Sequence, residues 1–262
     1  MKVINAILPI VAYTQERCGT IKLGEKGQFA PVSLSSYPGS GNTWVRYMIE
    51  EFTGYYTGSV FHDGKLYRGG FKGEYEDYTD GKVIVTKAHT FRSERPLTDA
   101  IMLIRNPYDA FLSEFNRVNG VGVTGNDHTG KASLDDFLSP KWTDMNFGKY
   151  AVRWYRLYSG LLESGHKMLP IIYEEMKADP KQEMEKIVNF LDTRTDYESK
   201  YECLFGDNSK RFKRSSEREF DPYDFIDNEK LEAVNEVIIK ISETLNRTHG
   251  ITLPETYLRN LH

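Results

Sequence analysis

Three signals follow one another without a gap near residue 31, and together they restrict the chain to one kind of fold. Pro31 to Ser36 has the length and composition of a buried strand, and Trp44 to Phe52 has a helical pattern. Between them lies a glycine-containing turn, Tyr-Pro-Gly-Ser-Gly-Asn-Thr. Such a turn presents backbone N–H groups and the positive end of a helix to an anion, so a phosphate cradle is expected. The alternative is an ordinary turn, because Asn42 replaces the Lys of the GxxxxGK[ST] pattern.

Strand and helix signals alternate along the rest of the chain. The further strand candidates are the apolar runs at residues 83–86, 101–104 and 169–173. The helix candidates are residues 107–119, 150–163, 180–191 and 229–245. This alternation is typical of an α/β domain in which helices flank a mostly parallel sheet. We expect a single domain over residues 1–262, with its core over about residues 31–246.

Two of these strand candidates end at residues that suit chemistry. Lys87 and His89 follow one strand, and alternation along an extended chain puts both side chains on the same face. A cation and an imidazole are what group transfer to a hydroxyl needs. Arg105 follows the next strand and Ser113 lies two turns into the helix after it, so both can contact one anion. The alternatives are a structural histidine and an arginine that pairs with a nearby carboxylate.

Three further segments stand out by composition. Residues 210–214 read Lys-Arg-Phe-Lys-Arg, and an aromatic ring beside several cations suits an adenine with a phosphate next to it. A solvated charged face is the alternative. Residues 55–81 combine Gly with many aromatic side chains, and residues 119–130 are rich in Gly. Because long loops are usually functional or disordered, residues 55–81 are expected to form either a lid or substrate wall, or poorly ordered surface.

Charge and cysteine content exclude other classes of protein. The 262 residues include 34 Lys and Arg against 38 Asp and Glu, so the formal net charge is −4 and nucleic-acid binding is not expected. Cys18 and Cys203 lie far apart, without a CxxC pair or a Cys/His cluster, so neither a disulfide framework nor a metal site is expected. The apolar run from Ala6 to Tyr13 contains Pro9 and is shorter than the about 20 residues of a membrane-spanning helix. No transmembrane segment is expected.

In their order along the chain, these elements resemble the sulfotransferases that use 3′-phosphoadenosine 5′-phosphosulfate (PAPS). YPGSGNTW from Tyr37 is similar to that family's 5′-phosphosulfate loop, and RNPYDAFLSEF from Arg105 is similar to its 3′-phosphate motif. YEEMK from Tyr173 resembles the YEDM segment of the cytosolic members, and FKR from Phe212 resembles the start of their C-terminal cofactor loop. The resemblance covers about residues 31–240. The amino-acid sequence of the first motif is most similar to that of animal sulfotransferases whose relatives carry WSC domains and act in the Golgi.

The resemblance implies the sulfotransferase fold, with a P-loop-like parallel sheet, and transfer of a sulfuryl group from PAPS to an acceptor hydroxyl. The acceptor would be a small molecule or a glycan, the transfer would be in line, and no metal would take part. His89 would be the general base, and Lys87 would stabilise the moving sulfuryl group. The residues that would bind the nucleotide are Pro38, Gly39, Ser40, Gly41, Asn42, Thr43, Trp44, Arg105, Ser113, Tyr173, Phe212, Lys213 and Arg214.

One position departs from the family. Gly39 stands where cytosolic members have Lys and many Golgi members have Arg, so another cation must face the bridging oxygen. Lys87 is the first candidate for this cation and Arg46 is the second. The alternative functions are a P-loop nucleotide kinase or triphosphatase, and an inactive nucleotide-binding module. We expect a cytoplasmic protein, or one of the Golgi lumen if an N-terminal anchor was removed; the oligomeric state is left open.

Overall fold

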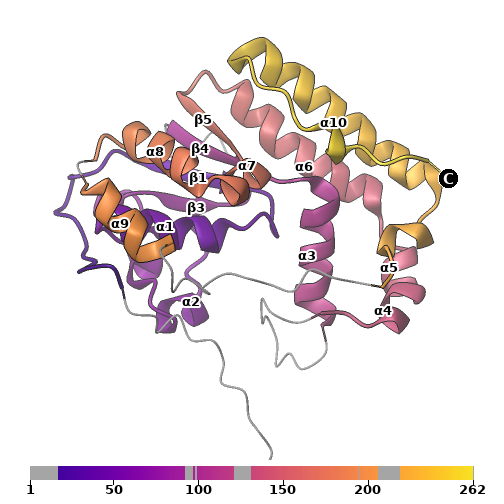
Figure 1. The fold of residues 1–262 in the computed structure, drawn as a ribbon, viewed down its shortest axis with the longest axis horizontal. Coiled ribbons are helices and arrows are strands. Elements are labelled where there is room, and N and C mark those ends of the chain that lie inside the picture. Colours follow the sequence, from indigo (N-terminus) through magenta and orange to yellow (C-terminus); the bar gives the residue numbers. More distant parts are fainter. Residues whose placement is uncertain are drawn as a thin grey trace, which may run out of the picture.

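Five parallel strands form the centre of the molecule, and helices cover both faces of the sheet (Figure 1). The computed structural model describes residues 17–91, 97, 99–120, 131–193, 195–205 and 219–261. The strands are β1 (Val32–Ser36), β2 (Gly58–Ser59), β3 (Thr86–Ala88), β4 (Asp99–Ile104) and β5 (Met168–Ile172). Their order in the sheet is β2-β3-β1-β4-β5, and each neighbouring pair is parallel. The prediction of an α/β domain with a parallel sheet is confirmed.

The helices fall between the strands or follow the last of them. The longer ones are α1 (Asn42–Thr53), α3 (Pro107–Asn119), α6 (Phe147–Leu162), α8 (Pro180–Phe190), α9 (Tyr197–Phe205) and α10 (Asn228–His249). The shorter ones are α2 (Gly64–Arg68), α4 (Leu134–Leu138), α5 (Pro140–Thr143), α7 (Tyr173–Ala178) and the 3-10 helices η1 (Lys72–Tyr75), η2 (Pro222–Phe225) and η3 (Glu255–Tyr257). Only the short helices and α9 lack a counterpart in the sequence analysis, because they are too short or too weakly periodic to show a pattern.

Alternate residues of β4 pack into two separate clusters, one on each face of the sheet. Ala100, Met102 and Ile104 pack with side chains of α3, α6 and α10. Ile101 and Leu103 pack with side chains of α1 and α8. Because both faces of the strand are covered, its sequence is one uninterrupted apolar run, and this is why the run was recognisable as a strand.

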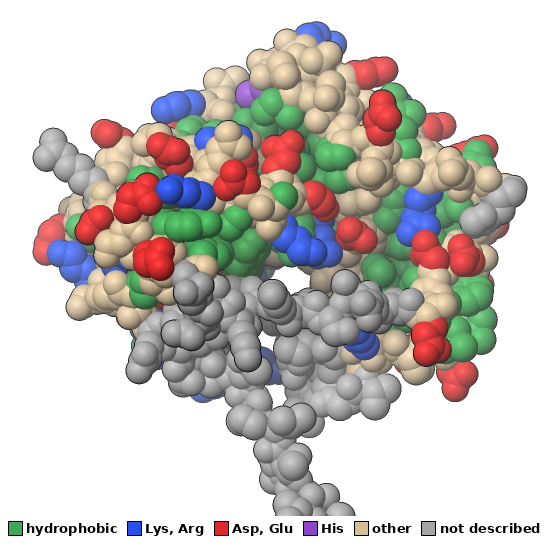
Figure 2. Space-filling view, in the orientation of Figure 1, with side chains coloured by type: hydrophobic (Ala, Val, Ile, Leu, Met, Phe, Trp, Pro, Cys, Tyr) green, Lys and Arg blue, Asp and Glu red, His purple; other side chains and the backbone are tan. Residues whose placement is uncertain are grey.

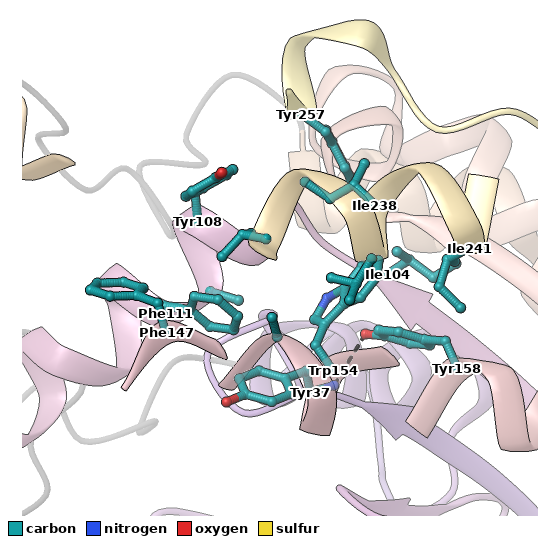
Figure 3. Close-up of a cluster of buried hydrophobic side chains, with 14 of the residues drawn as sticks. Tyr37, Ile104, Tyr108, Phe111, Phe147, Trp154, Tyr158, Ile238, Ile241 and Tyr257 are labelled. Carbon is teal, nitrogen blue, oxygen red and sulfur yellow. Dashed lines mark hydrogen bonds between the residues drawn. The ribbon is translucent and has the colours of Figure 1, made fainter. Parts of the chain in front are cut away.

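A buried tyrosine joins the first of these clusters to the loop that follows β1. The hydroxyl of Tyr158, on α6, donates to the Leu103 carbonyl at 2.7 Å and accepts the Tyr37 backbone N–H at 3.1 Å (Figure 3). Tyr158 is fully buried, so neither bond competes with water. The position of Tyr37, where the chain leaves the sheet, is therefore held from α6 as well as from β1.

Residues 55–81 are ordered around a buried ion pair, so the expectation of poorly ordered surface is wrong. The guanidinium of Arg46, on α1, donates to the carboxylate of Glu74 on η1, and both side chains are fully buried. Arg46 also donates to the hydroxyl of Thr57 at 2.8 Å and lies over the Phe71 ring. The other carboxylate oxygen of Glu74 accepts the backbone N–H of Asp63 at 3.0 Å. Arg46 and Glu74 thus hold β2, α2 and η1 against α1.

The strand expected at residues 83–86 lies further along the chain. The structure has β3 at Thr86–Ala88, so only Thr86 is shared. Ile84 donates its N–H to the Tyr56 carbonyl and the Val85 carbonyl accepts from Gly58, which means that the apolar run pairs with the segment leading into β2. An apolar run indicates that a segment is buried, not where its strand pairing begins. Here the chain is buried from Val83, whereas its pairing with β1 begins at Thr86.

A disulfide joins Cys18 to Cys203 on α9, and the expectation that the two cysteines form no such framework is wrong. Their Cα atoms lie 5.9 Å apart although 185 residues separate them along the chain. Lys200 donates to the Cys18 carbonyl at 2.7 Å, and Arg17 pairs with Glu50 of α1 at 3.1 Å. Arg17 and Cys18 are therefore docked between α1 and α9. Spacing along the sequence could not show this, because the fold alone decides which distant segments meet.

The described surface gives two further observations. In the described ranges, no helix has both the length and the apolar character that crossing a bilayer requires. On the face drawn in Figure 2, acidic and basic side chains are interspersed. That face therefore shows no separation of charge by sign.

Removing one member of the buried ion pair should destabilise the fold strongly. In the variant Glu74→Gln, Arg46 keeps its charge in a buried position without an anionic partner, which costs about 3–5 kcal/mol. For a chain of this size, calorimetry should show a Tm lower by roughly 6–20 °C. The control Glu198→Gln removes the partner of Lys181 in an exposed pair and should lower Tm by no more than about 4 °C. Equally small shifts in both variants would contradict the structural role of the buried pair.

Candidate active site

The segments that follow β1, β3, β4 and β5 leave the sheet at one edge, where the carboxyl ends of the parallel strands meet. His89 lies just after β3, Tyr37 directly after β1, Arg105 after β4 and Tyr173 after β5. β1 lies between β3 and β4, so the chain crosses to the other side of β1 after β3. Open α/β sheets bind ligands outside the carboxyl ends of their strands at such a switch point. This edge is the candidate active site.

The loop after β1 has the backbone of an anion cradle. Gly39 and Gly41 have φ angles of 81° and 85°, in the left-handed region that favours glycine. The N-cap of α1 is Gly41, and no side chain of the described residues caps the helix there. The amide of Asn42 donates to the Leu34 carbonyl and to the Ser36 hydroxyl, each at 3.1 Å, and so holds the loop on β1. The positive end of α1 is therefore directed into the cradle without a side-chain acceptor of its own.

Arg105 and Ser113 meet at Gly39. The Arg105 guanidinium donates to the Gly39 carbonyl at 2.7 Å, and its buried Nε has no hydrogen-bond partner in the described part of the chain. A Cβ added at Gly39 would lie 2.4 Å from the carbonyl oxygen of Ala110 and 3.3 Å from the Cβ of Ser113. No side chain fits there, which is a steric reason for glycine where the resembled family has Lys or Arg.

Two aromatic rings lie on the other side of the cradle. The centres of the Trp44 and Tyr173 rings are 5.8 Å apart in an edge-to-face arrangement. The Arg105 guanidinium carbon lies 4.7 Å from the centre of the Tyr173 ring. A Cβ on Gly41 would lie 2.4 Å from the Tyr173 ring, so the loop passes directly against it. Rings in this position suit a flat base next to the cradle.

The structure thus brings most of the predicted nucleotide-binding residues together. Pro38 to Trp44 form one loop and helix start, which contacts Arg105, Ser113 and Tyr173. The remaining predicted residues, Phe212, Lys213 and Arg214, lie outside the described residues. Their assignment stays a prediction.

His89 is held with one ring nitrogen occupied. Its Nδ1 lies 2.7 Å from the carbonyl oxygen of Ser36, the last residue of β1. Because a carbonyl only accepts, the network assigns the proton to Nδ1 and the lone pair to Nε2. Burial, and then the charge of Lys87, lower the pKa of His89 to about 4. The imidazole is therefore neutral at pH 7 and able to accept a proton at Nε2.

Lys87 faces the same way as His89, as the alternation predicted. Its Nζ lies 5.6 Å from the centre of the Phe61 ring, and the same ring lies 5.2 Å from the imidazole. Burial, and then the charge of Arg46, lower the pKa of Lys87 to about 8. The ammonium group is still mostly charged at pH 7, in a site where little water screens it.

Arg46, the second candidate for the missing cation, is not available. Its guanidinium lies in the interior, bonded to Glu74 and Thr57, and the assignment is wrong for that reason. The sequence analysis also missed Phe61 and Tyr158. Phe61 is one aromatic among many in residues 55–81, and Tyr158 has the pattern of an ordinary core residue of a helix. Only the folded sheet places them at the site.

Comparisons with known proteins point to the same family. A family model described as a sulfotransferase domain matches residues 87–219, about half of the chain. WSCD family member CG9164 of Drosophila melanogaster is 31% identical over an alignment of 212 residues that covers 73% of this chain and 61% of the relative. Sulfotransferase 1A1 of Rattus norvegicus is 21% identical over an alignment of 208 residues that covers 70% of this chain and 67% of the relative. The chain therefore spans less than two thirds of the length of the WSCD relative.

A solved structure supports the fold. The crystal structure of mouse sulfotransferase SULT7A1 complexed with PAP matches with a TM-score of 0.52 and covers 87% of each chain. At 18% sequence identity this likeness concerns the fold alone. The match of the family model over about half of the chain shows that the chain belongs to the sulfotransferase domain family.

Proposed function

We propose that this chain transfers a sulfuryl group from PAPS to the hydroxyl of an acceptor. The proposal rests on the position of His89 beside the cradle. The neutral imidazole is hydrogen-bonded through Nδ1 to the carbonyl of Ser36, directly before the loop that forms the cradle, and has its lone pair on Nε2. PAPS supplies the activated sulfuryl group when it is bound. The uncapped start of α1, the cradle at Gly39 and Gly41 and the unpartnered Nε of Arg105 fit a ligand with two separate anionic groups.

Each group of residues would contact a different part of the nucleotide or the acceptor. Residues 40–43 would hold the 5′ end of the nucleotide through backbone N–H groups, while Arg105 and Ser113 would bind its 3′-phosphate. Nε2 of His89 would take the proton of the acceptor hydroxyl as the oxygen–sulfur bond forms and the bond from sulfur to the 5′-phosphate oxygen breaks. Lys87 would stabilise the charge on the sulfuryl oxygens and the leaving phosphate.

We further propose that the chain works in an oxidising compartment, such as the Golgi lumen, rather than in the cytoplasm. The Cys18–Cys203 disulfide supports this proposal, because disulfides persist in the secretory pathway and are rare in the reducing cytosol. The disulfide closes most of the chain into one covalent loop. Because a cross-link restricts the unfolded state more when it closes a longer loop, this disulfide should be strongly stabilising.

The disulfide can be tested on protein recovered from the secretory pathway of a eukaryotic cell. Peptide mapping without reductant should recover Cys18 and Cys203 in one linked species. The variant Cys203→Ser should lose about 2–5 kcal/mol of stability, or roughly 4–20 °C in Tm. Wild-type protein treated with reductant should show the same loss. Two thiols that are both free to alkylate in the folded protein would contradict the proposed compartment.

The nucleotide assignment is tested by binding of 3′-phosphoadenosine 5′-phosphate (PAP). At 100 times its dissociation constant PAP should stabilise the protein by about 2.7 kcal/mol. Arg105→Ala should weaken PAP binding roughly 10- to 150-fold in titration calorimetry, because a charge-assisted hydrogen bond is worth about 1.5–3 kcal/mol. Arg156→Ala on the exposed face of α6 is the matched control and should bind normally. Stabilisation by ATP with Mg²⁺ but not by PAP would favour a kinase or triphosphatase.

The role of His89 is tested by turnover. His89→Ala should lower kcat by roughly 10²- to 10⁴-fold and leave PAP affinity within a few fold of wild type, because the imidazole faces the acceptor side. A variant that loses Tm and PAP affinity together would instead show a structural histidine. A stable variant that keeps its kcat would remove the base role.

The pH profile provides a second readout of the same pair. His89 must be neutral, so kcat/KM should stay high from pH 7 down to well below 6.5 and fall only toward its pKa of about 4. Lys87 must be charged, so kcat/KM should fall as the pH rises through about 8. Lys87→Arg should move this alkaline limb to higher pH, since arginine stays charged. An unchanged alkaline limb would contradict the assignment to Lys87.

A further inference from the structure

Beside the catalytic pair, the chain exposes a row of aromatic side chains that the proposed transfer does not use. The row consists of Phe61, His62, Tyr75 and Tyr67, and we refer to it as the aromatic row. The exposed fractions are 48% for Phe61, 54% for Tyr75 and 36% for Tyr67, and His62 is also exposed. Large apolar side chains that gather on the surface usually mark a binding site.

The row begins at the proposed base and leads away from it. The ring of Phe61 lies 5.2 Å from the His89 imidazole. His62 follows in the chain, and its ring lies 6.0 Å from that of Tyr75. The Tyr75 ring lies 4.9 Å from that of Tyr67. A ligand that presents a hydroxyl to His89 would therefore lie against Phe61, and a longer ligand would have the rings of Tyr75 and Tyr67 within reach beside His62.

The row is held rigid from below. Glu74, the neighbour of Tyr75, is locked in the buried pair with Arg46 and accepts the backbone N–H of Asp63, the neighbour of His62. On the outer side, Lys72 donates to the Tyr67 carbonyl at 3.0 Å and lies over the Tyr67 ring. The backbone that carries the rings is therefore fixed before any ligand binds, which lowers the conformational entropy lost on binding.

The exposure of the row indicates the class of ligand. Enclosed sites for small molecules bury most of the ligand and are lined by covered apolar side chains. Here half of the Phe61 and Tyr75 side chains face solvent, so the row offers flat surfaces and not an enclosure. Sugar rings pair an apolar C–H face with hydroxyl groups, and the exposed side chain of Arg68 lies in the same segment and can donate to those hydroxyls.

We propose that the aromatic row binds consecutive sugar rings and that the acceptor is therefore a glycan chain. The proposal that the glycan is an acceptor rests on the proposed sulfotransferase activity. Glycan binding itself does not depend on turnover and can be measured without it. The sugar that carries the reacting hydroxyl lies against Phe61 and His89. The sugars that follow stack on Tyr75 and Tyr67.

Binding is measured first, on an array of N-linked, O-linked and glycosaminoglycan oligosaccharides, in the absence of sulfate donor. Wild-type protein should bind a subset of chains of at least two sugars. Tyr75→Ala and Tyr67→Ala should each weaken that binding about 2- to 10-fold, and the double variant should weaken it further. Tyr75→Phe keeps the ring and should bind like wild type. Ile239→Ala, at an exposed apolar position on α10, is the control for loss of apolar surface.

Turnover is measured second, with the best glycan of the array and with 4-nitrophenol as a small acceptor. The two alanine variants should raise KM for the glycan by the same factor, leave kcat nearly unchanged, and leave KM for 4-nitrophenol and PAP affinity unchanged. Absence of glycan binding by the wild type, or binding that neither alanine variant alters, would overturn the aromatic row as a sugar site. Ring-dependent glycan binding without any sulfate transfer would uphold the row and overturn the proposed activity, so the two failures are distinguishable.

Discussion

The buried ion pair of Arg46 and Glu74 joins the two halves of the candidate site. Arg46 lies one turn into α1, whose start forms the anion cradle, and Glu74 lies in η1 beside the aromatic row. A buried pair of this kind adds little net stability compared with apolar side chains of the same size. Its charges are satisfied only when they are paired, however, so the pair favours one packing of η1 against α1. It thereby helps to fix the spacing between the proposed nucleotide side and the proposed acceptor side.

Much of the fold could be predicted from the sequence, because a strand such as β4 is covered on both faces and therefore contains a continuous apolar run, Ala100 to Ile104. Helix α3 has the bounds that were expected, since Pro107 suits a first turn and Gly120 follows its last residue. The order within residues 55–81 could not be predicted. It depends on Arg46, and a charged residue inside a helical pattern gives no sign that it is buried. The disulfide was missed because it depends on contact between segments 185 residues apart.

The site could be predicted to the extent that its residues directly follow strands, because the carboxyl ends of parallel strands lie at one edge of the sheet. The charge states of Lys87 and His89 could not be predicted. Burial lowers the pKa values of both Lys87 and His89, the charge of Arg46 adds to the shift of Lys87, and the charge of Lys87 adds to the shift of His89. None of these effects can be seen in the order of residues. Burial and the charge of Lys87 keep the imidazole neutral, while the ammonium stays mostly charged at pH 7. A base and a cation can then work side by side without a carboxylate between them.

The contact between Gly39 and α3 has a consequence for the discrimination between PAPS and ATP at the proposed site. Because no atom fits between Gly39 and the Ala110 carbonyl, the cradle and the helix that carries Ser113 cannot move closer together. The two proposed anion sites therefore stay separate. A nucleotide phosphorylated at both the 3′ and the 5′ position can fill both sites at once. ATP, which carries all its phosphates at the 5′ position, would leave one site to water, so an enzyme built this way can work in the presence of ATP without being blocked by it.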